Sequence, residues 1–142
     1  MRCLIVGTGS DIASALHARL LIDGWEVDGA TGHSMKIPDG NWDLLILAHG
    51  QLTPIGKFFE CDMNEWIGGM TVNAIYPLSC LRAAWPRRNP GATVVFIGGP
   101  NMAKTSPTYT SYRAGKAILE ELAGTLEAEY PECRFRILHP GM

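Results

Sequence analysis

The sequence lacks several features that would assign it to a specialised class of protein. No apolar run in its 142 residues is long enough to span a bilayer, and its first apolar stretch follows the initiating methionine without the basic, apolar and small-residue regions of a signal peptide. We therefore expect a soluble, cytoplasmic protein with no membrane partner.

Cysteine is sparse and scattered. The four cysteines form no CxxC pair, and no histidine lies at ligand spacing from them; they are Cys3, Cys61, Cys80 and Cys133. This spacing indicates neither a disulfide framework nor a metal site. We interpret these residues as thiols in or near the core.

Charge is also limited. Charged residues make up 18% of the chain, the net charge is −2, and the only basic cluster is Arg87-Arg88. Such a balance gives no reason to expect a nucleic-acid partner. With 46% hydrophobic residues, the chain can instead bury a sizeable core.

Apolar runs alternate with helical segments along the whole chain. This alternation is typical of a parallel sheet covered by helices on both faces. Strands are expected at 1–6, 25–30, 43–48, 93–97 and 134–138, and helices at 11–22, 62–84 and 110–129. The pattern predicts a single α/β domain over residues 1–142: a Rossmann-like, doubly wound parallel sheet of about five strands in three αβα layers.

A glycine-rich turn joins the first strand to the first helix. Gly7-Thr8-Gly9-Ser10 lets the backbone approach a pyrophosphate, and the amides at the helix start attract an anion. The turn thus indicates a dinucleotide site. The alternative is an ordinary tight turn that needs glycine for backbone reasons alone.

Tyr112 and Lys116 are four residues apart on the last predicted helix, so they share one face. A nearby ammonium favours the phenolate and would lower the Tyr112 pKa toward the working pH of a general acid. The alternative is a partly buried Tyr112 beside a solvated Lys116.

Several collinear motifs resemble the short-chain dehydrogenase/reductase family over essentially the whole length. The family's Tyr-x-x-x-Lys resembles Tyr112 and Lys116, its helical Asn resembles Asn73, its Asn-Asn-Ala-Gly resembles Leu47-Ala48-His49-Gly50, and its Pro-Gly resembles Pro140-Gly141. The resemblance implies an NAD(P)-dependent oxidoreductase that moves hydride between the nicotinamide and a small carbonyl or alcohol substrate.

The resemblance also implies roles for individual residues. Tyr112 would protonate the carbonyl oxygen, Lys116 would bind the nicotinamide ribose, and Asn73 would hold a water that links Lys116 to solvent. A local hydrogen bond is the alternative role for Asn73. Cofactor contacts would come from Gly7, Thr8, Gly9, Ser10, Asp11, Ile12, His33, Ala48, His49, Gly50, Tyr112, Lys116, Pro140 and Gly141.

The departures from the family pattern concern the phosphate and substrate sites. Asp11 and Ala13 replace the two later glycines of the family turn, and Asp11 would repel a pyrophosphate unless it points away as a helix cap. Gly99 stands where the family has its catalytic serine. Substitute donors could be Asn101, Thr105, Ser106, or a backbone amide of Gly98 or Gly99.

The end of the second strand favours NADP(H) over NAD(H). It leads into Thr31-Gly32-His33-Ser34 without the acidic residue that would bind the ribose hydroxyls of NAD, and His33 and Lys36 are candidate phosphate partners. The alternative is that both are ordinary solvated loop residues.

Gly99, together with the absence of the family's C-terminal substrate lid, leaves two other hypotheses open. The chain could be a catalytically impaired nucleotide-binding or assembly protein, or, with Asp11 as support, a structural subunit that binds no nucleotide. We also expect a homodimer through the helices that contain Asn73 and Tyr112, because both carry apolar residues on more than one face.

Overall fold

The computed structural model describes residues 1–31, 36–99 and 104–140. Its strands are β1 (Arg2–Val6), β2 (Glu26–Ala30), β3 (Trp42–Leu47), β4 (Arg88–Ile97) and β5 (Arg134–Leu138). Its α-helices are α1 (Asp11–Ile22), α2 (Met63–Met70), α3 (Tyr76–Ala84) and α4 (Thr110–Glu129), with short η segments at Phe58–Glu60, Thr71–Ile75 and Trp85–Arg87. Within the described ranges, no helix combines the length and apolarity needed to cross a membrane.

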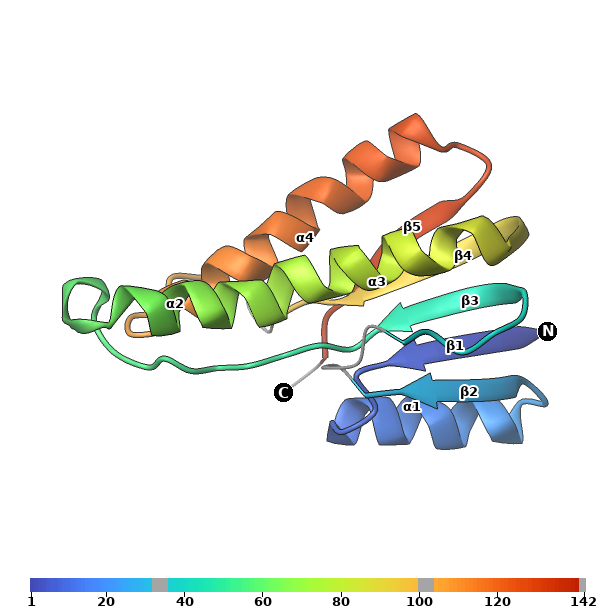
Figure 1. Ribbon diagram of the computed structural model, residues 1–142, viewed down its shortest axis with the longest axis horizontal. Helices are drawn as coiled ribbons and strands as arrows, with labels where there is room; N and C mark the ends of the chain where they lie inside the picture. The colour runs from blue at the N-terminus through green and yellow to red at the C-terminus, as the bar shows by residue number, and fades with distance from the viewer. Residues whose placement is uncertain (32–35, 100–103, 141–142) are drawn as a thin grey trace.

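The five strands form one parallel sheet in the order β2-β1-β3-β4-β5. Strand order reverses between β1 and β3, and in Figure 1 the arrowheads of β1, β2 and β3 point to the same side. In open α/β sheets, ligands bind beyond the carboxyl ends of the strands at such a reversal. This topology predicts a ligand site at the loops that follow β1 and β3.

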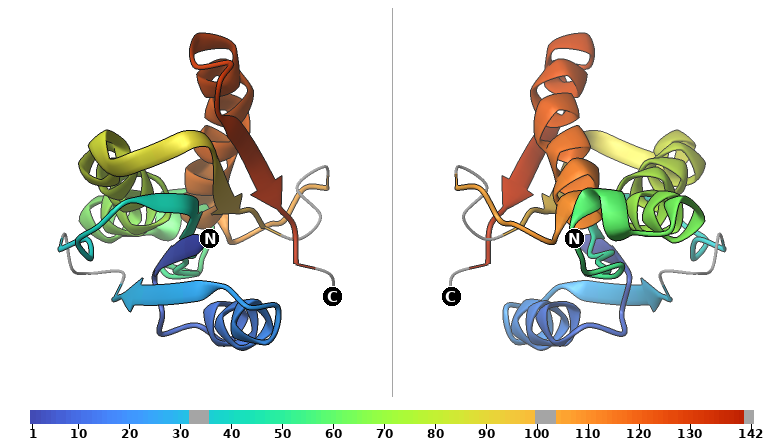
Figure 2. Two further views of the ribbon diagram at one scale, coloured as in Figure 1. Left: turned by 90° about the vertical axis from the view of Figure 1, so that its right-hand side faces the viewer. Right: turned by 90° about the vertical axis from the view of Figure 1, so that its left-hand side faces the viewer.

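Helices cover both faces of the sheet, as the sequence predicted. On one face α1 packs over a cluster built from alternate strand residues such as Cys3, Ile5 and Ile46. On the other face α3 and α4 pack over a larger cluster that includes Leu45, Phe96 and further strand residues. Figure 2 shows α1 and α3 on opposite sides of the strands. The three-layer Rossmann-like prediction is confirmed.

The predicted helix at 62–84 is interrupted by a wider turn. It begins as expected, because the Asp62 carboxylate accepts a hydrogen bond from the Glu65 amide at 3.0 Å. Residues Thr71–Ile75 then form a π-helical turn between α2 and α3. Pro77 has no amide hydrogen to donate to the Asn73 carbonyl four residues earlier, so a regular α-helical ladder cannot continue there. π-turns of this kind are frequent at functional sites.

The start of α4 is tied to α2 and to this π-turn. Trp66 Nε1 donates to the Thr110 hydroxyl at 2.9 Å, and the buried Ser111 hydroxyl donates to the Trp66 carbonyl at 2.6 Å. A Cβ on Gly115 would lie 2.6 Å from the Asn73 Cβ, so only glycine permits this approach of the two helices. The packing holds the first turns of α4 against the segment that carries Asn73.

Candidate active site

A cleft of about 380 Å³ lies beyond the carboxyl ends of β1 and β3. Six of the residues that the sequence assigned to the cofactor line it: Gly7, Gly9, Ser10, Ala48, His49 and Gly50. Thr31 and Val72 complete the lining. The turn after β1 and the end of β3 therefore meet at one site, although they are about forty residues apart in the chain.

The glycine turn has the geometry of a phosphate cradle. Gly7 has a φ of +94°, and a Cβ there would lie 2.8 Å from the Ala48 carbonyl carbon. A Cβ on Gly9, by contrast, would meet no atom within 4 Å, which leaves the backbone open to a ligand. The pyrophosphate of a dinucleotide fits such an open turn at a helix N-terminus.

The structure corrects the expected alternative role of Asp11. Ser10 caps α1 instead, because its hydroxyl accepts a hydrogen bond from the Ala13 amide at 3.1 Å. Asp11 is exposed in the first turn. Its carboxylate is thus placed at the helix N-terminus without the capping bond that would hold it in one orientation.

Three further predicted cofactor residues, Thr8, Ile12 and Pro140, are described but are not part of the cleft lining. Thr8 donates from its amide and its hydroxyl to the Ala30 carbonyl, each at 3.3 Å, which joins the turn to the end of β2. Ile12 packs in the cluster between α1 and the sheet, and Pro140 is half-buried just beyond β5. His33 and Gly141 lie outside the described residues, as does Asn101.

Lys116 is buried and links the segment after β3 to the end of β4. Its ammonium donates to the carbonyls of His49 and Ile97, both at 2.8 Å. Burial lowers the pKa of Lys116 from 10.5 to about 8. The side chain lies directly behind the cleft wall, because His49 belongs to that wall.

Tyr112 lies beside Lys116, but its pKa is not lowered as the sequence suggested. The Lys116 Nζ is 5.7 Å from the centre of the Tyr112 ring. Burial raises the pKa of Tyr112, and Arg113 offsets only part of that effect. The hydrogen bonds of the Lys116 ammonium go instead to the carbonyls of His49 and Ile97.

Asn73 is fully buried and holds the loop after β3. Its side-chain Oδ1 accepts from the Gln51 amide at 2.9 Å, and its Nδ2 donates to the carbonyls of Gln51 and Gly69, both at 2.8 Å. Only the bond to Gly69 is local, whereas the two bonds to Gln51 join the helix to the loop after β3. The Asn73 backbone carbonyl receives no hydrogen bond from Pro77, which has no amide hydrogen.

Gly98 and Gly99 follow β4, where the family resemblance places a catalytic serine. The Gly98 amide donates to the Leu138 carbonyl at 2.9 Å, so it is not available as the substitute donor. Of the two backbone candidates, Gly99 remains. Thr105 is exposed, and the Ser106 hydroxyl accepts from Arg113 at 3.4 Å, so neither is held toward the cleft by a described contact.

Sequence reasoning missed a contact between α4 and the segment after β5. Glu120 Oε1 lies 2.8 Å from His139 Nε2, and His139 Nδ1 donates to the Gly99 carbonyl at 2.9 Å. One signal was available, since Glu120 continues the four-residue spacing of Tyr112 and Lys116 along α4. Nothing in the sequence paired it with His139.

Comparisons with known proteins agree with this fold. No protein-family model matches the sequence. An uncharacterized oxidoreductase of Schizosaccharomyces pombe is 28% identical over 104 residues, covering 72% of this chain and 42% of the yeast protein. The chain therefore spans less than half the length of this curated relative.

Solved structures give a closer match in shape than in sequence. A carbonyl reductase from Pseudomonas aeruginosa superposes with a TM-score of 0.83 at 23% identity, over 99% of this chain and 80% of that one. An aldohexose dehydrogenase from Thermoplasma acidophilum superposes with a TM-score of 0.87 at 17% identity, over 98% and 65%. The chain thus has the fold of the short-chain dehydrogenases and reductases, as its motifs predicted.

Proposed function

We propose that the protein is an NAD(P)-dependent oxidoreductase that reduces a small carbonyl substrate or oxidises the corresponding alcohol. The observation that carries the proposal is the position of Lys116, which donates to the carbonyl of the cleft residue His49 and lies beside Tyr112. A buried amine behind the cleft, next to a phenol, supplies groups suited to carbonyl reduction. The similarity to solved reductases and dehydrogenases supports the same reaction class.

Each residue then has a distinct task. When bound, the nicotinamide would supply or accept the hydride. The Tyr112 hydroxyl would donate a proton to the carbonyl oxygen, and its raised pKa keeps the phenol protonated for that step. Lys116 would bind the nicotinamide ribose, and the Asn73 backbone carbonyl would hold a water for proton return.

The proposal includes a preference for NADP(H) over NAD(H). Thr31 lines the cleft after β2, and no carboxylate stands at that position to bind a ribose hydroxyl or repel a 2′-phosphate. Titration with NADPH and NADH, followed by cofactor fluorescence, should give a smaller Kd for NADPH. Equal affinities or tighter NADH binding would contradict the preference, and no binding of either would contradict the proposed function.

A nucleotide-binding or assembly protein without turnover is the second candidate. It is favoured by Gly99, because glycine has no hydroxyl to stabilise charge on the substrate oxygen, and losing such a donor can cost about 10²-fold or more in rate. The same titration, followed by an assay of NADPH oxidation with a panel of small aldehydes and ketones, distinguishes this candidate from the reductase. Tight binding without NADPH oxidation would favour this candidate.

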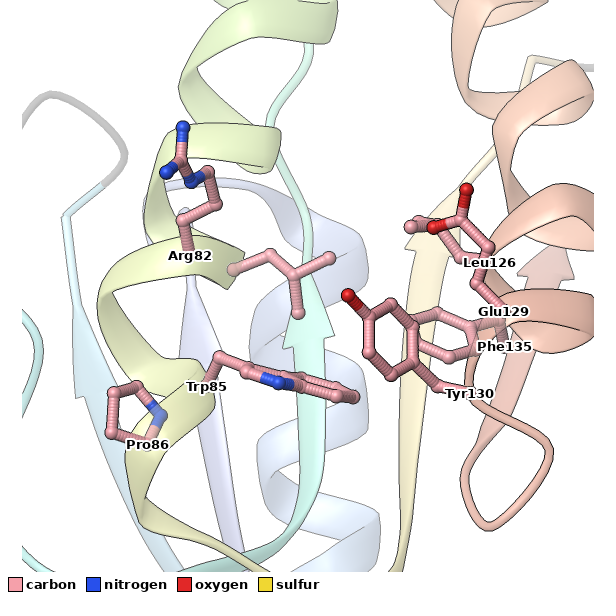
Figure 3. A pocket seen from close by; sticks show the side chains of 8 residues that line it. Arg82, Trp85, Pro86, Leu126, Glu129, Tyr130 and Phe135 are labelled. Carbon is pink, nitrogen blue, oxygen red and sulfur yellow. The ribbon is translucent and has the colours of Figure 1, made fainter.

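We further propose a homodimer through α2, α3 and α4. Three apolar side chains on the α2 and π-turn segment are largely exposed: Met63 at 52%, Ile67 at 45% and Ile75 at 43%. A separate groove of about 500 Å³ lies between the ends of α3 and α4. Figure 3 shows Trp85 and Tyr130 pointing toward each other across it. Exposed apolar surface of this kind is commonly buried in a two-fold contact.

The dimer can be tested by light scattering at micromolar concentration. Wild-type protein should have twice the monomer mass, and Ile75→Lys should reduce it to the monomer mass because a charge in an apolar contact is costly to desolvate. Leu52→Lys is the control, since Leu52 is an exposed aliphatic residue, at 52% against 43% for Ile75, but lies in the loop after β3. A monomeric wild type would contradict the proposal.

A further inference from the structure

The imidazole of His139 lies between the end of β4 and the middle of α4. Its Nδ1 is 2.9 Å from the Gly99 carbonyl oxygen, and its Nε2 is 2.8 Å from Glu120 Oε1. A carbonyl oxygen only accepts hydrogen bonds, so Nδ1 carries a hydrogen. Glu120 Oε1 is buried and makes no hydrogen bond of regular geometry within the described part of the chain, so its contact with Nε2 is one of close approach. The ring therefore lies between the Gly99 carbonyl and the Glu120 carboxylate.

The end of β4 is shaped to receive this ring. A Cβ on Gly98 would lie 2.7 Å from the His139 Cε1 and 2.7 Å from the Ile137 Cγ2, so a side chain at position 98 would displace the imidazole. The Gly98 amide also donates to the Leu138 carbonyl at 2.9 Å. Gly98 and His139 thus fit each other across neighbouring strands.

Gly99 has no side chain that could hold its backbone in one conformation. The bond from His139 is a described contact that holds the Gly99 carbonyl. Glu120 in turn anchors His139 to α4, two turns beyond Tyr112 on the same helix face.

We propose that His139, in contact with Glu120, is a positioning residue that fixes the Gly98–Gly99 segment after β4, the position at which the resemblance places the donor to the substrate oxygen. The inference rests on the proposed reductase function for its catalytic consequence. It extends that function, because His139 and Glu120 belong neither to the cleft lining nor to the Tyr112–Lys116 pair. His139 acts through Gly99 and does not itself contact the substrate.

Two substitutions separate the two contacts of the ring. Asparagine carries its amide nitrogen the same number of bonds from Cβ as the histidine Nδ1, so His139→Asn retains a donor for the Gly99 carbonyl. Glutamine carries its nitrogen at the position of Nε2, so His139→Gln retains the Glu120 contact and loses the bond to Gly99. His139→Ala removes both.

The first measurement is amide hydrogen exchange of the segment that contains Gly98 and Gly99, which needs no turnover. Loss of the hydrogen bond from His139 to the Gly99 carbonyl should speed exchange by up to about tenfold in His139→Ala and His139→Gln. His139→Asn should stay close to wild type. Equal exchange in all four proteins, or equal acceleration in all three variants, would overturn the positioning role.

The second measurement is carbonyl reduction by NADPH. A displaced turn should lower kcat by up to about 10²-fold in His139→Ala and His139→Gln, with His139→Asn recovering most of the loss and the Kd for NADPH unchanged. Wild-type kcat in His139→Gln would overturn the proposed catalytic consequence. If the wild type reduces no carbonyl, the reductase proposal fails, whereas the exchange measurement still decides whether His139 positions the turn.

Discussion

Replacement of Tyr112 by phenylalanine should lower carbonyl reductase turnover by about 10² to 10⁴-fold, the usual contribution of a general acid. The substitution removes only the hydroxyl, and the half-buried ring keeps its packing at the start of α4. Because Lys116 makes its hydrogen bonds to the carbonyls of His49 and Ile97 rather than to Tyr112, the cofactor site should keep its shape. The Kd for NADPH should therefore change little.

Steady-state kinetics and fluorescence titration of the same preparations measure both quantities. Tyr109→Phe is a matched control, because it removes the same group from a half-buried tyrosine three residues earlier. It should retain nearly wild-type turnover. Unchanged turnover in Tyr112→Phe, or an equal loss in Tyr109→Phe, would rule out the assigned role of Tyr112.

Lys116 should make stability depend on pH in a window set by its lowered pKa. The folded protein releases the Lys116 proton near pH 8, whereas the unfolded chain retains it to about 10.5. Between these values the unfolded state binds more protons, so the free energy of unfolding should rise with pH. The full shift corresponds to about 3 kcal/mol.

Denaturant unfolding of wild type and Lys116→Met at pH 7.5 and pH 10 isolates this contribution, because other titrating groups are common to both proteins. The stability of wild type relative to the variant should increase by about 2 to 3 kcal/mol over this interval. Lys57→Met is the control, since Lys57 is exposed. A difference between wild type and Lys116→Met that does not change with pH would show that Lys116 is not held as described.

Most of the fold could be predicted from the sequence because its signals are local. The bounds of α1, α4 and β5 match the predicted ranges, since periodic apolar residues and flanking turns mark them. The first half of β4 was missed. Asn89-Pro90-Gly91 has the composition of a turn, and Gly91 has a φ of +74°, yet Arg88 still pairs with Trp42 across an irregular register. That pairing depends on a distant strand.

The part of the candidate cleft that one short segment forms could be predicted from the sequence. Gly7, Gly9 and Ser10 form a turn whose residue types already specify an open backbone at a helix start. The partners of Lys116 and the raised pKa of Tyr112 were not predictable, because they depend on how deeply α4 packs against β3 and β4. The contact between Glu120 and His139 joins α4 to the segment after β5, and sequence spacing does not encode such a distance.

The central claim is that the cleft beyond β1 and β3 binds a nicotinamide dinucleotide. The most direct test is NADPH titration of isotope-labelled protein, with backbone amide shifts followed by NMR. The largest shifts should fall on the cleft residues Gly7, Gly9, Ser10, Ala48 and Gly50, and a Gly9→Val variant should bind much more weakly because its side chain enters the open turn. Shifts confined to other surfaces, or undiminished binding by Gly9→Val, would contradict the assignment.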